Sequence, residues 1–188
     1  MTKGKFAGII PVVFDPVVEA PFLLALLFLT KSTAPLWLLG LVILISTLPP
    51  VFFLRYGMRR GFIADWETTE RDERHGLNLV CLLAIFLALL LIYFFGDSFL
   101  LKLFFVLFTL MFLYTFITFF WKISGHMTAN TALFLVINLF FGWQFWWLIV
   151  LIPLVAWARL FRKKHDVWQV VGGITLASLV ILCGVSLL

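Results

Sequence analysis

Long apolar runs, separated by short polar or turn-forming stretches, make up most of this chain. The runs at residues 77–95 and 100–121 approach or reach the roughly 20 residues that a helix needs to cross a hydrocarbon core of about 30 Å. They do not alternate polar and apolar residues as outer-membrane strands do. The pattern therefore predicts transmembrane helices, near residues 17–31, 35–56, 77–95, 99–121, 128–142, 144–161 and 167–187.

These runs predict an all-α integral membrane protein, a polytopic bundle of six to seven transmembrane helices. The count depends on the first run, because its roughly 15 residues rise only about 22 Å as a helix. Just before it, Pro11 and Pro16 argue against a continuous regular helix over residues 6–16 and favour an interfacial segment. The connections are short except for the polar loop 57–76, so we expect residues 1–188 to form a single membrane domain.

The composition agrees with lipid as the main solvent of the chain. Hydrophobic residues make up 64% of the sequence and charged residues only 12%, which leaves too little polar surface for a protein dispersed in water. The net charge of +5 fits anionic lipid better than nucleic acid, because the 23 Phe and 8 Trp fall largely in the apolar runs. We therefore expect the bilayer to be a partner and nucleic acid not to be one.

Most of the basic residues lie on one side of the predicted topology. Only Lys31 and Lys102 lie on the other side. Because basic residues are enriched in cytoplasmic loops, this side is predicted to be cytoplasmic. The basic residues on it are Lys3, Lys5, Arg55, Arg59, Arg60, Arg71, Arg74, Lys122, Arg159, Arg162, Lys163 and Lys164.

Three polar clusters return to this cytoplasmic side, because pairs of predicted spans separate them. A phosphoryl group in transfer spreads negative charge over three oxygens, so it needs planar cationic donors and a nucleophile. The clusters contain such groups. They are Arg71 and Arg74 in the polar loop, Ser124-Gly125-His126 within residues 122–128, and Arg159 followed by His165 within residues 158–169.

Ser-Gly-His at residues 124–126 and Arg-x5-His at residues 159–165 resemble the second and third motifs of the type 2 phosphatidic acid phosphatase (PAP2) superfamily, a group of membrane lipid phosphatases. The register of the spans extends the resemblance from about residue 57 to the C-terminus. The stretches Ile63-Ala-Asp-Trp-Glu and Arg71-Asp-Glu-Arg74, and His165 with Gln169-Val170 before a glycine, resemble a divergent bacterial and archaeal branch. This resemblance implies a prokaryotic plasma membrane. The chain departs from the family where Gln169 replaces an acid and where the usual first motif, with Arg-Pro, is absent.

The resemblance implies an enzyme that hydrolyses a lipid phosphomonoester or diphosphate through a phosphohistidine, with no cofactor and no metal. Candidate substrates are phosphatidic acid, phosphatidylglycerol phosphate and polyprenyl phosphates or diphosphates. By analogy, His165 would attack phosphorus, while His126 would protonate the leaving oxygen and then activate water. The phosphate oxygens would be bound by Arg71, Arg74, Arg159, Ser124 and Gly125.

Further residues are assigned roles around this centre. On a helix, Gln169 lies one turn beyond His165 and could bind its other ring nitrogen, which would fix the tautomer. Asp166 could assist if the helix starts late. Asp65 and Lys122 are additional candidates without an assigned role, and His75 is interpreted as a bystander.

Each assignment has a structural alternative. Ser124 fits the N-cap of a helix from about Met127, a role that can coexist with catalysis. Arg159 could be an interfacial cation, an interpretation that suits the basic run at 162–164 better. For the whole protein, the alternative is a non-catalytic transporter subunit or a lipid-binding scaffold of the same fold, motivated by Gln169 and the incomplete first motif.

Overall fold

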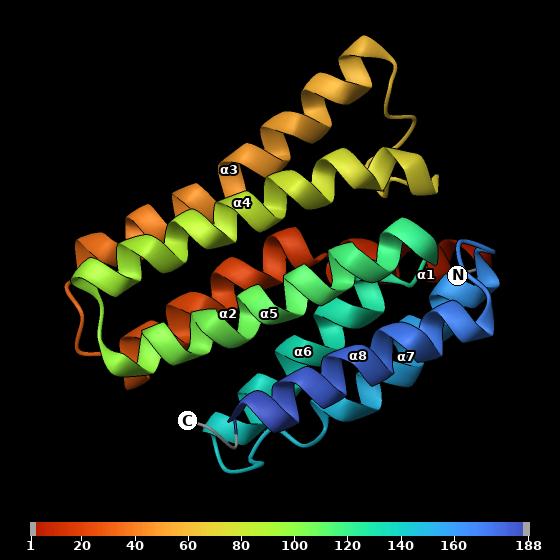
Figure 1. The fold of residues 1–188 in the computed structure, drawn as a ribbon. Coiled ribbons are helices and arrows are strands. Elements are labelled where there is room, and N and C mark those ends of the chain that lie inside the picture. The colour runs from red at the N-terminus through yellow and green to blue at the C-terminus, as the bar shows by residue number, and fades with distance from the viewer. Residues whose placement is uncertain (1–2, 186–188) are drawn as a thin grey trace. The chain divides into compact units, whose positions relative to one another are not determined.

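In the computed structural model, the described residues, 3–185, form eight helices and no strand (Figure 1). This confirms the predicted all-α class for that part of the chain. The helices are α1 Lys3–Val13, α2 Pro16–Lys31, α3 Leu36–Arg60, α4 Arg71–Phe95, α5 Ser98–Phe120, α6 Gly125–Phe140, α7 Leu148–Phe161 and α8 Val167–Val185. Seven of the helices overlap the seven apolar runs, although α7 begins at Leu148 and not at residue 144, and α4 begins at Arg71 and not at residue 77.

Four of these helices, α3, α4, α5 and α8, are long and apolar enough to cross a membrane. The pair α1 and α2 also passes this test when taken together, with a bend of 43° at the break between them, so it is a candidate for a fifth, broken span. Helices α6 and α7 are apolar but shorter. The described residues therefore form a helical membrane protein with four candidate spans, or five if the bent pair is one span.

The N-terminal prolines separate two helices and do not prevent helix formation. Residues 6–13 belong to α1, which contains Pro11 in its last turn, so the predicted irregular segment is confined to Phe14 and Asp15. Pro16 occupies the first position of α2, where the missing N–H costs little because it would have no acceptor within the helix. Asp15 caps α2, since its carboxylate accepts a hydrogen bond from the Val17 N–H at 2.9 Å.

The polar loop is shorter than the predicted 57–76. Helix α3 continues to Arg60 and α4 begins at Arg71, so only residues 61–70 connect them. The loop was predicted too long because charged residues lie at the ends of both helices. An exposed, polar helix end cannot be distinguished from a loop by composition. Arg71 and Arg74, expected in the loop, instead lie in the first turns of α4.

The chain divides into two compact units. The first contains the described N-terminal residues to Leu23 together with those from Trp121 onward, and the second contains residues 24–120. In the first unit, buried residues from α1, α6, α7 and α8 form one core: Ile10, Met127, Val155, Ala158 and Val170. In the second, the core comes from α2 to α5: Leu24, Phe28, Leu38, Val42, Ala88, Ile92, Leu100 and Phe104.

Within the second unit, Asp97 links the connection between α4 and α5 to the connection between α2 and α3 by hydrogen bonds. Its Oδ1 accepts a hydrogen bond from the Leu100 N–H at 2.9 Å and so caps α5. Its Oδ2 accepts hydrogen bonds from Ser32 Oγ and from the Thr33 N–H, both at 2.7 Å. Partial burial alone would raise the pKa of Asp97, but these hydrogen bonds outweigh it and lower the pKa below its usual value.

We expect Asp97→Ala to lower the free energy of unfolding by about 1 kcal/mol at neutral pH, the usual effect of losing an N-cap. Because the folded-state pKa of Asp97 is lowered, its carboxylate stabilises the fold above the usual pKa of 3.8, and this contribution is lost as the pH falls through the folded-state pKa. Unfolding in detergent micelles as a function of pH measures both effects. Asp72→Ala, at an exposed position in α4, is the control. A constant difference between Asp97→Ala and the parent down to acid pH would contradict the assignment.

Candidate functional site

The second motif forms the N-terminus of α6. Ser124 is buried and caps the helix, since its hydroxyl accepts a hydrogen bond from the Met127 N–H at 3.4 Å, as the sequence predicted. The Ser124 carbonyl accepts hydrogen bonds from the N–H and the hydroxyl of Thr128, at 2.9 and 3.0 Å. Gly125 and His126 therefore occupy the first turn. The N–H groups of a first turn lack acceptors within the helix and favour an anion.

Arg159 lies in the last turn of α7, and only 1% of it is exposed. The helix ends in a Schellman motif: the Lys164 N–H donates to the Arg159 carbonyl at 3.1 Å, and the Lys163 N–H donates to the Leu160 carbonyl at 3.0 Å. Lys163 has the left-handed conformation, with φ +53°, that glycine usually adopts in this motif. The tight ending leaves His165 only a few residues from the end of α7.

A capping box starts α8. The Asp166 carboxylate accepts a hydrogen bond from the Gln169 N–H at 2.9 Å, and Gln169 Oε1 accepts one from the Asp166 N–H at 3.4 Å. The helix starts at Val167, so Asp166 serves as its cap. Asp-x-x-Gln before an apolar run is a readable signature of this motif, which the sequence analysis overlooked.

Gln169 also determines which nitrogen of His165 carries hydrogen. His165 Nδ1 lies 2.9 Å from Gln169 Oε1, the contact that the helical spacing predicted. An amide oxygen can only accept, and this one also accepts from the Asp166 N–H, so Nδ1 is the protonated nitrogen of the neutral ring. The lone pair is then on Nε2 of a side chain that is 7% exposed. This tautomer suits nucleophilic attack through Nε2.

Backbone contacts join the second and third motifs within the first unit. The Ser124 N–H donates to the Gln169 carbonyl at 3.0 Å, so the N-termini of α6 and α8 meet. Gly173, one turn further along α8, permits this approach: a Cβ at this position would lie 2.7 Å from the Ser124 carbonyl oxygen and 3.0 Å from Thr128 Oγ1. The two sequence motifs thus belong to one local structure.

We expect Gly173→Ala to push α8 away from α6 and to lower the free energy of unfolding by about 1–3 kcal/mol. Gly8→Ala is the matched control, because Gly8 also lies within a helix of the first unit but a Cβ there would meet nothing within 4 Å. Its expected effect is a small stabilisation, from the higher helix propensity of alanine. Denaturant unfolding in micelles measures both. Equal effects of the two substitutions would contradict the close approach of α8 to Ser124.

Arg71 and Arg74 belong to the second unit, as does Asp65. Arg74 is 4% exposed, and its Nε donates to the Thr68 carbonyl at 2.7 Å, so it helps to order the 61–70 connection. Asp65 accepts a hydrogen bond from the Thr69 hydroxyl at 2.5 Å. Both residues therefore have structural roles in this connection, which the sequence analysis did not assign.

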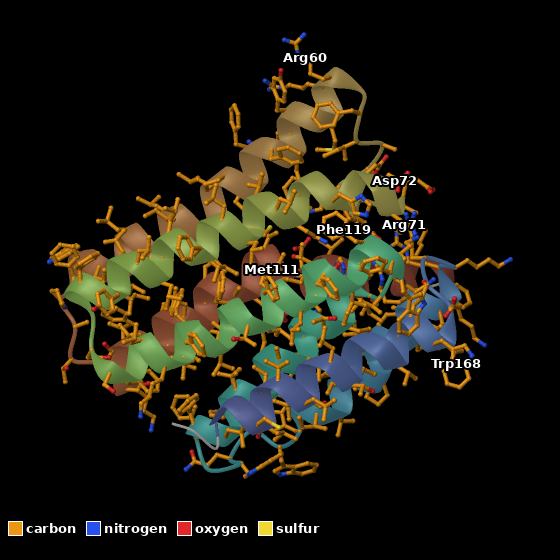
Figure 2. The ribbon with its side chains drawn as sticks, viewed as in Figure 1. Arg60, Arg71, Asp72, Met111, Phe119 and Trp168 are labelled. Carbon is orange, nitrogen blue, oxygen red and sulfur yellow. The ribbon has the colours of Figure 1, made fainter. Side chains whose placement is uncertain are left out.

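Arg71 is exposed and contacts the end of α5. Its Nη1 lies 3.5 Å from the Phe120 carbonyl, and its Nε lies 3.6 Å from the Asp72 carboxylate. Figure 2 shows Arg71 and Asp72 at the start of α4, at the same end of the α4–α5 pair as Phe119. The His75 ring contacts the Phe119 ring at a tilt of 32°, with centroids 4.6 Å apart. The convergence of Arg71 and Arg74 with the first unit stays a prediction from sequence.

Lys122 precedes α6 and is half-buried, in the first unit. Within the described residues, no three His, Cys, Asp or Glu side chains are grouped so that they could hold a metal ion. The donors that the site does offer are imidazole, guanidinium, hydroxyl and backbone N–H groups. Comparisons of the chain with protein-family models, with curated proteins and with solved structures find no match.

Proposed function

We propose that this protein is a membrane-embedded lipid phosphatase of the PAP2 type. It hydrolyses a phosphomonoester or diphosphate on a lipid, with the headgroup at the ends of α6, α7 and α8 and the hydrophobic tail in the bilayer. Candidate substrates are phosphatidic acid, phosphatidylglycerol phosphate and polyprenyl phosphates or diphosphates. The hydrophobic tail supplies much of the affinity because it stays in lipid.

The orientation of His165 is the observation that carries this proposal. Its Nδ1 is held by Gln169, which places the lone pair of the neutral ring on Nε2. The backbone carbonyl of Gln169 in turn accepts a hydrogen bond from the Ser124 N–H. His126 follows in the same helical turn as Ser124. Arg159 lies at the end of α7, close in sequence to His165, and its guanidinium has the planar donors that match phosphate oxygens, which supports an anionic substrate.

These groups suffice for a two-step phosphoryl transfer. In the first step, His165 Nε2 bonds to phosphorus and the bond from phosphorus to the lipid oxygen breaks, while His126 protonates that oxygen. In the second, His126 removes a proton from water, the water oxygen bonds to phosphorus, and the phosphohistidine bond breaks to release inorganic phosphate. Arg159 and the N–H groups at the start of α6 neutralise charge on the phosphoryl oxygens.

Gln169 makes this site different from one with an acid in that position. An amide fixes the tautomer of His165 but supplies no negative charge to stabilise a cationic ring, so we expect a weaker nucleophile. The same substitution motivates the second candidate function, a non-catalytic transporter subunit or lipid-binding scaffold of this fold.

The proposal includes a topology. We infer six to seven crossings, with α6 and α7 completing the bundle, in a prokaryotic plasma membrane. The excess of basic residues assigns the ends that carry the site to the cytoplasmic face. A cytoplasmic site would meet lipid phosphates made on that leaflet. The sequence resemblance also assigns Arg71 and Arg74, in the first turn of α4, to phosphate binding.

Phosphate release tests the function directly. The purified protein, in mixed micelles, is incubated with phosphatidic acid, phosphatidylglycerol phosphate, a polyprenyl phosphate and a polyprenyl diphosphate, each in turn, and inorganic phosphate is measured. We expect release from at least one of them. Release from none, by protein that is folded and monodisperse, would exclude the phosphatase and favour the non-catalytic alternative.

A further inference from the structure

We propose that Asn130 is a positioning residue that ties the break between α1 and α2 to the turn carrying His126. The proposal rests on the function inferred above, and it extends the site to the N-terminal helices, which the sequence motifs do not include.

Asn130 is 0% exposed and lies one helical turn beyond His126 in α6. Its Nδ2 donates two hydrogen bonds, one to the His126 carbonyl at 2.9 Å and one to the Phe14 carbonyl at 3.1 Å. Two carbonyl acceptors require both hydrogens of an amide NH2 group. Asparagine meets this requirement, whereas aspartate and leucine at the same position do not.

The Phe14 carbonyl is available because the helix is broken there. In a continuous helix it would accept a hydrogen bond from the N–H of residue 18. The Val18 N–H instead donates to the Asp15 carbonyl at 2.9 Å. The break between Val13 and Pro16 therefore supplies the acceptor that Asn130 uses, and it is connected in this way to α6.

Packing of α1 supports the same turn of α6. Ile10 shares a buried core with Met127, the residue next to His126. Phe14 contacts Phe134 edge-to-face, with ring centroids 6.1 Å apart. Met127, the next residue after His126, thus packs in a core with α1. The carbonyl of His126 is connected through the Asn130 side chain to Phe14, the residue that follows α1.

A general acid and base requires this kind of support, because proton transfer depends on sub-ångström placement of the imidazole. By holding the carbonyl of His126, Asn130 restrains the backbone from which the ring projects. It touches no reacting atom in this scheme. Its loss should slow proton transfer much more than it weakens phosphate binding, because Arg159 and the Ser124 cap of α6 do not depend on the Asn130 side chain.

Asn138 provides a matched control on the same helix. It is also 0% exposed, and its Nδ2 makes the same type of bond to the carbonyl four residues earlier, that of Phe134, at 2.9 Å. Within the described residues its side chain has no hydrogen bond to another helix. Asn130→Ala and Asn138→Ala thus remove the same amide at equal burial, and only the first breaks the connection to Phe14.

The first experiment compares kcat of these two variants with that of the parent, per folded molecule, on a lipid phosphate that the parent hydrolyses. We expect kcat of Asn130→Ala to fall about tenfold or more, with a changed pH profile. Its inhibition constant for inorganic phosphate should stay within about twofold of the parent. Asn138→Ala should keep both values. Equal kcat in the two variants would overturn the proposal.

A second measurement tests the position of His126 without requiring phosphatase activity. Diethyl pyrocarbonate acylates accessible, unprotonated imidazole, and mass spectrometry quantifies the labelling of His126 as a function of pH. We expect Asn130→Ala, but not Asn138→Ala, to change the rate or the midpoint of His126 labelling. If the parent releases no phosphate but this selective change is found, the phosphatase assignment fails while the positioning role stands. Identical labelling of His126 in both variants overturns that role.

Discussion

Replacing His165 by asparagine is expected to lower kcat/KM for a lipid phosphate by at least about 10³-fold, because it removes the nucleophile. Asparagine is the informative substitution here. Its amide NH2 can take the place of Nδ1 and still donate to Gln169, so the start of α8 is retained, but it has no counterpart of Nε2. Loss of activity would then report the missing nucleophile and not a disordered helix.

The parent should also form a phosphorylated intermediate that His165→Asn cannot form. Phosphohistidine is labile in acid and stable in base, so substrate labelled on phosphorus, quenched in alkali and analysed by mass spectrometry, locates the modified residue. His75→Asn is the control, since His75 belongs to the second unit and has no assigned role in the transfer. Activity of His165→Asn within tenfold of the parent would show that another group attacks phosphorus.

The sequence predicts the helical elements well where length and apolarity coincide. Each of the seven apolar runs contains a helix, because hydrophobic length alone distinguishes such segments from the connections. The start of the run at 144–161 was placed too early, because the apolar residues of the turn before α7 have the same composition as the helix. Composition is less informative at helix ends. Arg59, Arg60, Arg71 and Asp72 are polar residues within helices, which explains why the predicted loop was too long.

Local contacts of the site could also be predicted. The four-residue spacing of His165 and Gln169 implied their contact, and Ser124 was recognisable as a cap. The bond from Asn130 to Phe14 could not, because 116 residues separate the two and nothing in the local pattern relates them. An asparagine in an apolar helix indicates that its side chain needs a hydrogen-bond partner, but the sequence does not show that this partner is Phe14.

The second large loss of activity is expected from substitution of Arg159. Arg159→Met keeps the length of the side chain and removes the guanidinium, so kcat/KM per folded molecule should fall by about 10²-fold or more. Arg159→Lys restores the charge without the planar pair of donors that matches phosphate oxygens, and we expect it to recover only part of the loss. The inhibition constant for inorganic phosphate should weaken in both variants, and more in the methionine variant.

The alternative, an interfacial cation, makes the opposite prediction. Such a residue reaches toward water with its charged end, as exposed Lys163 can, whereas Arg159 is 1% exposed. Arg162→Met, at the end of the same helix, is therefore the control and should keep activity within about twofold. If Arg159→Met binds inorganic phosphate as the parent does, Arg159 is not a phosphate ligand.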